Sequence, residues 1–157
     1  MTLESGIAAI VADAERAAWP PHDLDAPVEP FEQLGLYLGR AGMLWALRRL
    51  GSALDVPIDV ALLRGNASLL IGETGVLLVT RDDDARLQTL IDANAEHPSW
   101  ELLWGSPGTL IAARHAELDA SRSAEILWAR RRSDGLWQQR CVGRDFVLLG
   151  AAHGFAG

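Results

Sequence analysis

The chain has 157 residues, of which 49% are hydrophobic, so it is long enough for one domain with a core and too apolar for a disordered protein. Its formal net charge of -7 disfavours non-specific binding to nucleic acid. Cys141 is the only cysteine, which excludes an intrachain disulfide, and no signal peptide or membrane-spanning run is visible, so we expect a cytoplasmic protein.

The first part of the chain predicts a helix and then an irregular connection. Residues 3–18 are expected to form an amphipathic helix, because apolar residues recur there at helical spacing. Prolines enforce an irregular connection over residues 19–30, since proline cannot continue a helix. A helix is then predicted to end near Leu50, and a short one is predicted over residues 58–65.

Four pairs of glycines in the pattern Gly-x-x-Gly divide the chain. They begin at residues 39, 72, 105 and 154, so the first three lie 33 residues apart. Apolar residues precede each pair, and an apolar run follows the first three. Because glycine permits positive φ and close approach of the backbone, each pair is interpreted as a tight turn that leads into a buried helix. The regular spacing indicates an internal repeat.

The second pair is followed by a buried helix and then by a helix with one apolar stripe. The acidic run Asp82-Asp83-Asp84 is interpreted as the N-terminus of the latter, where carboxylates meet the positive end of the helix dipole. A metal site is the weaker alternative for this run. The stripe consists of Leu87, Leu90, Ile91 and Asn94.

The third pair is expected to begin a helix over residues 107–118, with Ser106 as its N-cap and Pro107 at its first position. Another helix is predicted over residues 121–132. Its inward residues are expected to be Ile126, Leu127 and Trp128. Its C-terminus carries the triplet Arg130-Arg131-Arg132, interpreted as a solvated helix end, with a phosphate-binding patch as the alternative.

Residues 133–147 explain the longer spacing before the fourth pair. Apolar and polar residues partly alternate there around a Val-Gly turn, which predicts a small β-hairpin insert near residues 136–147. Elsewhere buried helices alternate with one-stripe helices, as in an open solenoid or a closed α/α toroid. The signatures of tetratricopeptide and ankyrin repeats are absent. We therefore predict a single all-α domain over 1–157 that forms part of an α/α toroid.

Three motifs together resemble the lanthionine synthetase C-like family from about residue 31 to the end. They are Tyr37-Leu38-Gly39-Arg40-Ala41-Gly42, Leu103-Trp104-Gly105-Ser106-Pro107-Gly108 and Ala151-Ala152-His153-Gly154-Phe155-Ala156-Gly157. The resemblance implies an α/α toroid of inner and outer helices, of which this chain is expected to be the N-terminal half.

The resemblance also implies an activity, the addition of a thiol across a dehydroalanine or dehydrobutyrine. The partner is then a peptide with dehydroamino acids, or a small thiol. In the family, a zinc ion held by two cysteines and a histidine binds the thiol and favours the thiolate. Addition produces an enolate that needs a proton donor, and the histidine of the Ala-His-Gly motif, here His153, is implied in that role. A histidine, with an ordinary pKa of about 6.5, suits this task.

The zinc ligands of the family lie downstream of the Ala-His-Gly motif, and this chain offers no comparable set. Cys141, His97, His115 and His153 do not have the spacing of metal ligands. Cys141 is therefore interpreted as a small hydrophobic residue, and His22, His97 and His115 are interpreted as structural or solvated. We therefore expect no zinc in this chain, no zinc-dependent thiol addition by the chain alone, and a C-terminal half or partner that completes the toroid.

Two other functions stay open. One is a non-catalytic toroidal or solenoid scaffold that binds a peptide. The other is a glycosidase of the six-hairpin type, which needs two carboxylates beside its cavity. Glu73 and Glu101 are the candidates for that pair, although both are interpreted as surface residues of the turns. Without the resemblance, His153 would be interpreted as a cap for backbone groups at a helix start.

Overall fold

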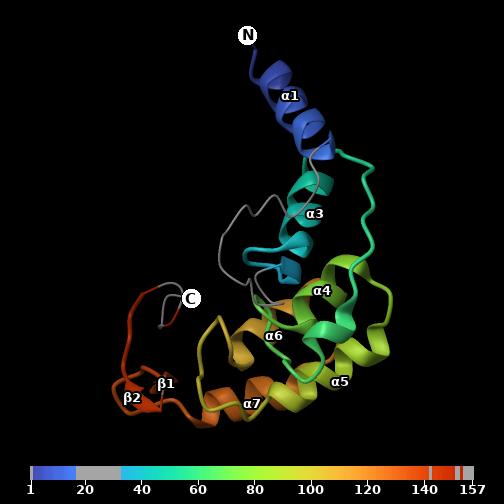
Figure 1. Cartoon of the computed structure of the whole chain (residues 1–157). Helices are drawn as coiled ribbons and strands as arrows, with labels where there is room; N and C mark the ends of the chain where they lie inside the picture. Colours follow the sequence, from blue (N-terminus) through green and yellow to red (C-terminus); the bar gives the residue numbers. More distant parts are fainter. Residues whose placement is uncertain (1, 17–32, 142, 151–152, 154–157) are drawn as a thin grey trace.

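The structure is a computed structural model, and it describes residues 2–16, 33–141, 143–150 and 153 (Figure 1). It is mostly helical and contains one antiparallel pair of strands. The predicted helical fold and the small hairpin are therefore confirmed. The proline-rich connection, His22 and the fourth glycine pair lie outside the described residues.

Each predicted helix is present and ends slightly earlier than predicted. The helices are α1 (Leu3–Arg16), α3 (Arg40–Arg49), α4 (Glu73–Thr80), α5 (Asp84–Asn94), α6 (Ser106–Ala116) and α7 (Ser121–Ala129), with a short 3-10 helix η1 (Val60–Leu63). The hairpin consists of β1 (Gln139–Cys141) and β2 (Arg144–Phe146). Helices α4 and α6 end where Arg81 and Glu117 adopt left-handed backbone, with φ of 60° and 59°.

The first glycine of each described pair is the N-cap of a helix. Gly39, Gly72 and Gly105 have φ of -107°, -120° and -92°, so the positive φ expected at a tight turn is wrong here. Close approach of the backbone is the reason for glycine, since a Cβ on Gly105 would lie 2.8 Å from the Glu101 nitrogen. Ser106 is consequently the first residue of α6 and not its N-cap.

The second glycines of the second and third pairs pack against the preceding repeat. A Cβ on Gly75 would clash with the carbonyl oxygen of Leu69 and lie 2.9 Å from the Cβ of Leu36. A Cβ on Gly108 would clash with the carbonyl oxygen of Leu102 and lie 3.1 Å from the Cβ of Leu69. The turns therefore stack on one another with the same offset, which confirms the repeat for the described pairs.

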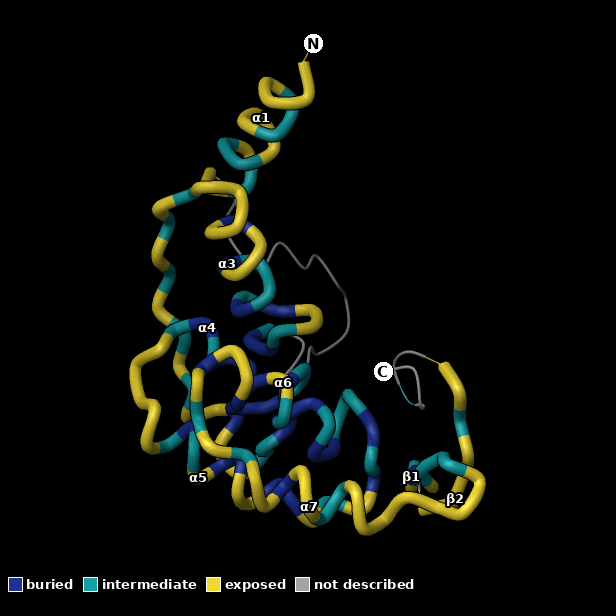
Figure 2. Tube along the Cα trace, turned by 180° about the vertical axis from the view of Figure 1, so that it is seen from behind, coloured by how far each residue is buried: buried dark blue, intermediate teal, exposed yellow. Residues whose placement is uncertain are grey.

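Helices α3, α4 and α6 contact one another in succession, and we call them a row; α5 and α7 form a second contacting pair. Helix α4 contacts both α3 and α6, while α5 contacts α7 and also packs on α4 and α6. Buried residues concentrate where α4, α5 and α6 meet (Figure 2), and α1 extends away from this region without any buried residue. The predicted stripe of α5 is buried throughout.

Two of the helices bury less than expected. Helix α3 buries one face, and its Trp45 is 49% exposed, so a fully buried helix is wrong for the first repeat. On α7, Ile126 and Leu127 are half-buried, but Trp128 is 67% exposed and does not face inward. The Trp128 ring instead lies 6.3 Å from the ring of Trp137.

Candidate functional site

Glu101 is a buried carboxylate in the turn before the third glycine pair. Its side chain accepts two backbone hydrogen bonds, from the Leu103 nitrogen at 2.8 Å to Oε2 and from the Trp104 nitrogen at 2.6 Å to Oε1. Charge-assisted bonds of this kind compensate for the loss of water around a buried charge. Glu101 is only 1% exposed, so the expectation of a surface residue is wrong.

His153 lies directly against this carboxylate. Its Nδ1 is 3.1 Å from Glu101 Oε2, and its ring centroid is 5.4 Å from that of Trp104. His153 of the Ala-His-Gly motif thus lies against Trp104 of the Trp-Gly-Ser-Pro-Gly motif, although the two residues are far apart in the sequence. Because a carboxylate accepts hydrogen bonds, this contact assigns the proton of a neutral imidazole to Nδ1 and leaves Nε2 as the nitrogen that can exchange a proton.

A pocket of about 520 Å³ opens beside His153. It is lined by Trp104, Cys141, Arg144, Phe146, Leu148 and His153. We call it the histidine pocket. Cys141 and Arg144 are directly opposite each other in the hairpin, so the insert contributes a thiol and a guanidinium to one wall. Most of the remaining lining is apolar or aromatic, which is typical of a site for an organic ligand.

The charge of Glu101 acts on two other titratable groups. Burial raises the pKa of the Cys141 thiol, and the negative charge of Glu101 raises it further. Burial lowers the pKa of His97, while Glu101 opposes that change. His97 also accepts a hydrogen bond at Nδ1 from the Ser99 nitrogen at 3.3 Å, so its place is structural.

The described residues do not fit the zinc ion that the family resemblance implies. Within them, no group of three or more histidine, cysteine, aspartate or glutamate side chains is placed to hold a metal. Cys141 and His153 share the histidine pocket, but a catalytic zinc needs about three protein ligands. His115 is exposed in the last turn of α6 and lines none of the pockets described here.

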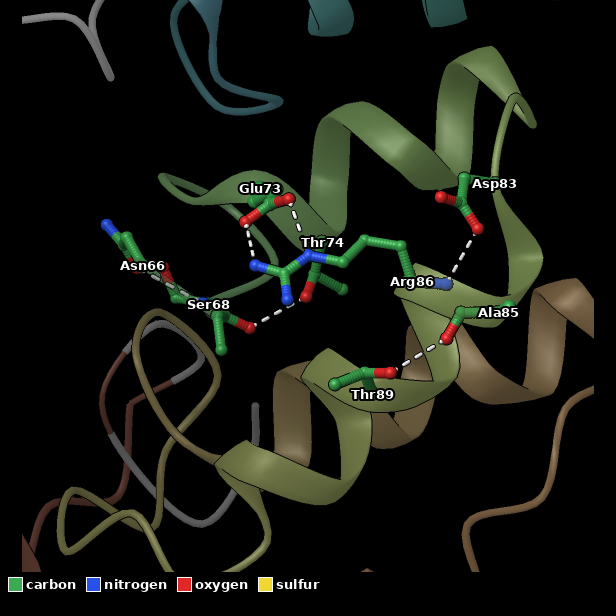
Figure 3. A network of polar contacts seen from close by, with 9 residues as sticks. Asn66, Ser68, Glu73, Thr74, Asp83, Ala85, Arg86 and Thr89 are labelled. Carbon is green, nitrogen blue, oxygen red and sulfur yellow. Dashed lines mark hydrogen bonds and ion pairs between the residues drawn. The ribbon is translucent and has the colours of Figure 1, made fainter. Parts of the chain in front are cut away.

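Glu73, the other carboxylate singled out in the sequence, joins two helices (Figure 3). Its Oε1 and Oε2 accept hydrogen bonds from Arg86 Nε at 2.9 Å and Nη2 at 2.8 Å. It is buried, so its expected surface position is wrong. Asp83 accepts a bond from the Arg86 nitrogen at 2.8 Å and caps α5, which confirms the acidic run as a helix start. With both oxygens bound to Arg86, Glu73 has a structural role.

Sequence reasoning singled out His153 and Glu101 but predicted neither their contact nor the place of Arg144 in the lining of the histidine pocket. The available signal for Glu101 was its place four residues before Gly105, just ahead of a motif already singled out. Comparisons with known protein families, with curated proteins and with solved structures give no match. No helix formed by the described residues is both long and apolar enough to cross a membrane.

Proposed function

We propose that this chain is part of a lanthionine synthetase C-like protein, which adds a thiol across the double bond of a dehydroamino acid. The observation that carries the proposal is the 3.1 Å contact between His153 Nδ1 and Glu101 Oε2 at the edge of the histidine pocket. His153 belongs to one motif on which the resemblance depends, and its ring also lies against Trp104 of another. Glu101 gives the histidine the partner that an acid–base residue requires.

The proposed architecture is an arc of an α/α toroid. The row α3, α4 and α6 would be its inner layer, and α5 and α7 would belong to its outer layer. Support comes from the contacts within the row and within the second pair, and from the constant offset with which the glycine turns stack. The remainder of the ring and its zinc ligands are proposed to come from a C-terminal half or a partner.

His153 is assigned the protonation step of the reaction. A thiolate forms a C–S bond to the β-carbon of the dehydroamino acid, and the π electrons move to the α-carbon and its carbonyl to give an enolate. Protonated His153 donates the Nε2 proton to the α-carbon, while Glu101 accepts the Nδ1 hydrogen bond and orients the ring. The histidine then recovers a proton from solvent or from the next thiol, so the net reaction adds one S–H bond across the alkene.

The histidine pocket contains its own thiol, and this gives a direct test on the chain as it stands. A short peptide with a central dehydroalanine is incubated with the protein, and the intact mass is followed. We expect a single adduct on Cys141, the only thiol, with a mass equal to protein plus peptide because nothing leaves. His153→Asn keeps a donor toward Glu101 but removes the exchangeable proton, and it should slow the adduct about tenfold or more.

Iodoacetamide provides the matched control. It alkylates a thiolate as iodide leaves, so no carbanion has to be protonated. His153→Asn should therefore leave the iodoacetamide rate nearly unchanged. A wild-type protein that forms no adduct, or a variant that slows both reagents equally, would contradict the proposed role. Tight binding of the dehydroalanine peptide without addition would instead favour the non-catalytic peptide scaffold.

A further inference from the structure

A second pocket of about 320 Å³ lies on the other face of the hairpin. It is lined by Pro98, Trp100, Arg130, Arg132, Gln138, Arg140 and Asp145, and we call it the arginine pocket. Side chains alternate between the faces of a strand, so the opposed pair Arg140 and Asp145 faces this pocket while the adjacent pair Cys141 and Arg144 lines the histidine pocket. The hairpin is therefore a wall shared by both pockets.

Positive charge is concentrated in the arginine pocket of a chain that is acidic as a whole. Three guanidinium groups and one carboxylate line it. Arg132 is already bound by Asp134, with 2.9 Å between Nη2 and Oδ2. The guanidinium groups of Arg130 and Arg140 form no hydrogen bond or ion pair with the described part of the chain. Two guanidinium groups are thus available to a ligand.

The pocket also holds an aromatic ring in a fixed position. Trp100 has φ of 46°, a left-handed conformation that is costly for a residue of this size. Its neighbour Ser99 donates a hydrogen bond from Oγ to the Arg140 carbonyl at 3.0 Å, which fastens β1 to this turn. The Arg130 guanidinium lies 5.7 Å from the centre of the Trp100 ring. The Trp100 indole in the strained turn and the Arg130 guanidinium at the end of α7 therefore lie side by side.

We propose that the arginine pocket binds an acidic side chain of a peptide. A planar guanidinium matches a carboxylate through two parallel hydrogen bonds. Trp100 and Pro98 offer an apolar wall to the methylene groups of a glutamate, and the volume suits one or two side chains. Asp145 lies in the same pocket and repels a phosphate dianion more strongly than a single carboxylate. A peptide held there lies beside the histidine pocket, and this recognition does not depend on thiol addition.

The test measures binding of a fluorescein-labelled peptide with four central glutamates to the full chain by anisotropy. The double variant Arg130→Gln/Arg140→Gln should bind the peptide at least about tenfold more weakly than the wild type. The affinity of the wild type should fall as salt is added. Arg114→Gln is the matched charge control, because Arg114 is exposed on α6 outside this pocket. Arg144→Gln tests whether the charge of the histidine pocket contributes. Circular dichroism establishes that each variant is folded.

The proposal predicts that only the double variant loses binding of the glutamate peptide. Equal binding by the double variant and wild type, or no binding by wild type, would overturn it. Loss of peptide binding in the Arg144→Gln variant alone would mean that the acidic ligand binds in the histidine pocket, and this result would also overturn the proposal. Inorganic phosphate serves as competitor, and displacement of the peptide by less phosphate than acetate would identify a phosphate ligand in place of a carboxylate. None of these outcomes depends on the dehydroalanine adduct.

Discussion

Glu101 influences three titratable side chains from one buried position. It contacts His153, raises the pKa of Cys141 and opposes the lowered pKa of His97. The two backbone hydrogen bonds to its oxygens keep it in place before any ligand arrives. A carboxylate fixed in this manner can orient an imidazole without reorganisation, which is what an acid–base pair requires.

The pKa of Cys141 gives a prediction about pH. Burial, and next the charge of Glu101, disfavour the thiolate, so alkylation by iodoacetamide should reach half its maximal rate at a higher pH in the folded protein than in urea. Glu101→Gln removes the charge and should shift this midpoint downward, so the variant reacts faster at a fixed pH below the midpoint. Quenched alkylation followed by mass spectrometry measures both. A midpoint equal to that in urea would mean that the thiol is fully solvated.

At the level of elements, the glycine pairs combine two tasks. They begin the helices α3, α4 and α6 without a side-chain cap, and they bring each turn against the preceding one. Both tasks depend on the missing Cβ and not on a left-handed backbone. The turns thereby set the spacing between neighbouring helices of the row.

Substitution of a stacked glycine should therefore destabilise the fold. Gly75→Ala places a methyl group against the Leu69 carbonyl and the Leu36 side chain, so we expect a loss of about 1–3 kcal/mol in the free energy of unfolding. Gly6→Ala is the control, because nothing lies within 4 Å of its Cβ and alanine favours the helix α1. Urea denaturation followed by circular dichroism compares the two. Equal stability of Gly75→Ala and the wild type would mean that the turns do not stack closely.

The elements were more predictable than the site. Helical spacing, glycine pairs and the Val-Gly turn are local patterns, and they placed the helices and the hairpin to within a few residues. The burial of Glu101 depends on two backbone donors and on His153, which is 52 residues away. No local pattern encodes such contacts. The prediction that Trp128 faces inward is wrong for a similar reason. Its ring lies near Trp137, which is outside the helix, and the helical pattern does not encode that contact.

On the scale of the whole molecule, the repeat and the hairpin insert have different roles. In the described part of the chain, the stacked turns run as far as the one that holds Glu101, and the helices α3, α4 and α6 that follow them contact one another in succession. The hairpin adds a thiol and an arginine to one pocket and an arginine to another. The helical repeat thus holds the turn with Glu101 in place, and the hairpin contributes the thiol and the arginine side chains of the two pockets.

The central claim is that Glu101 and His153 act as one unit, and a double-variant cycle tests it most directly. The rate of the dehydroalanine adduct at Cys141 is measured for wild type, Glu101→Gln, His153→Asn and the combination, and each is divided by its own iodoacetamide rate to remove the effect on the thiol. A coupled pair predicts that the combination is no slower than the slower single variant. Losses that multiply, or a Glu101→Gln variant as fast as the wild type, would contradict the claim.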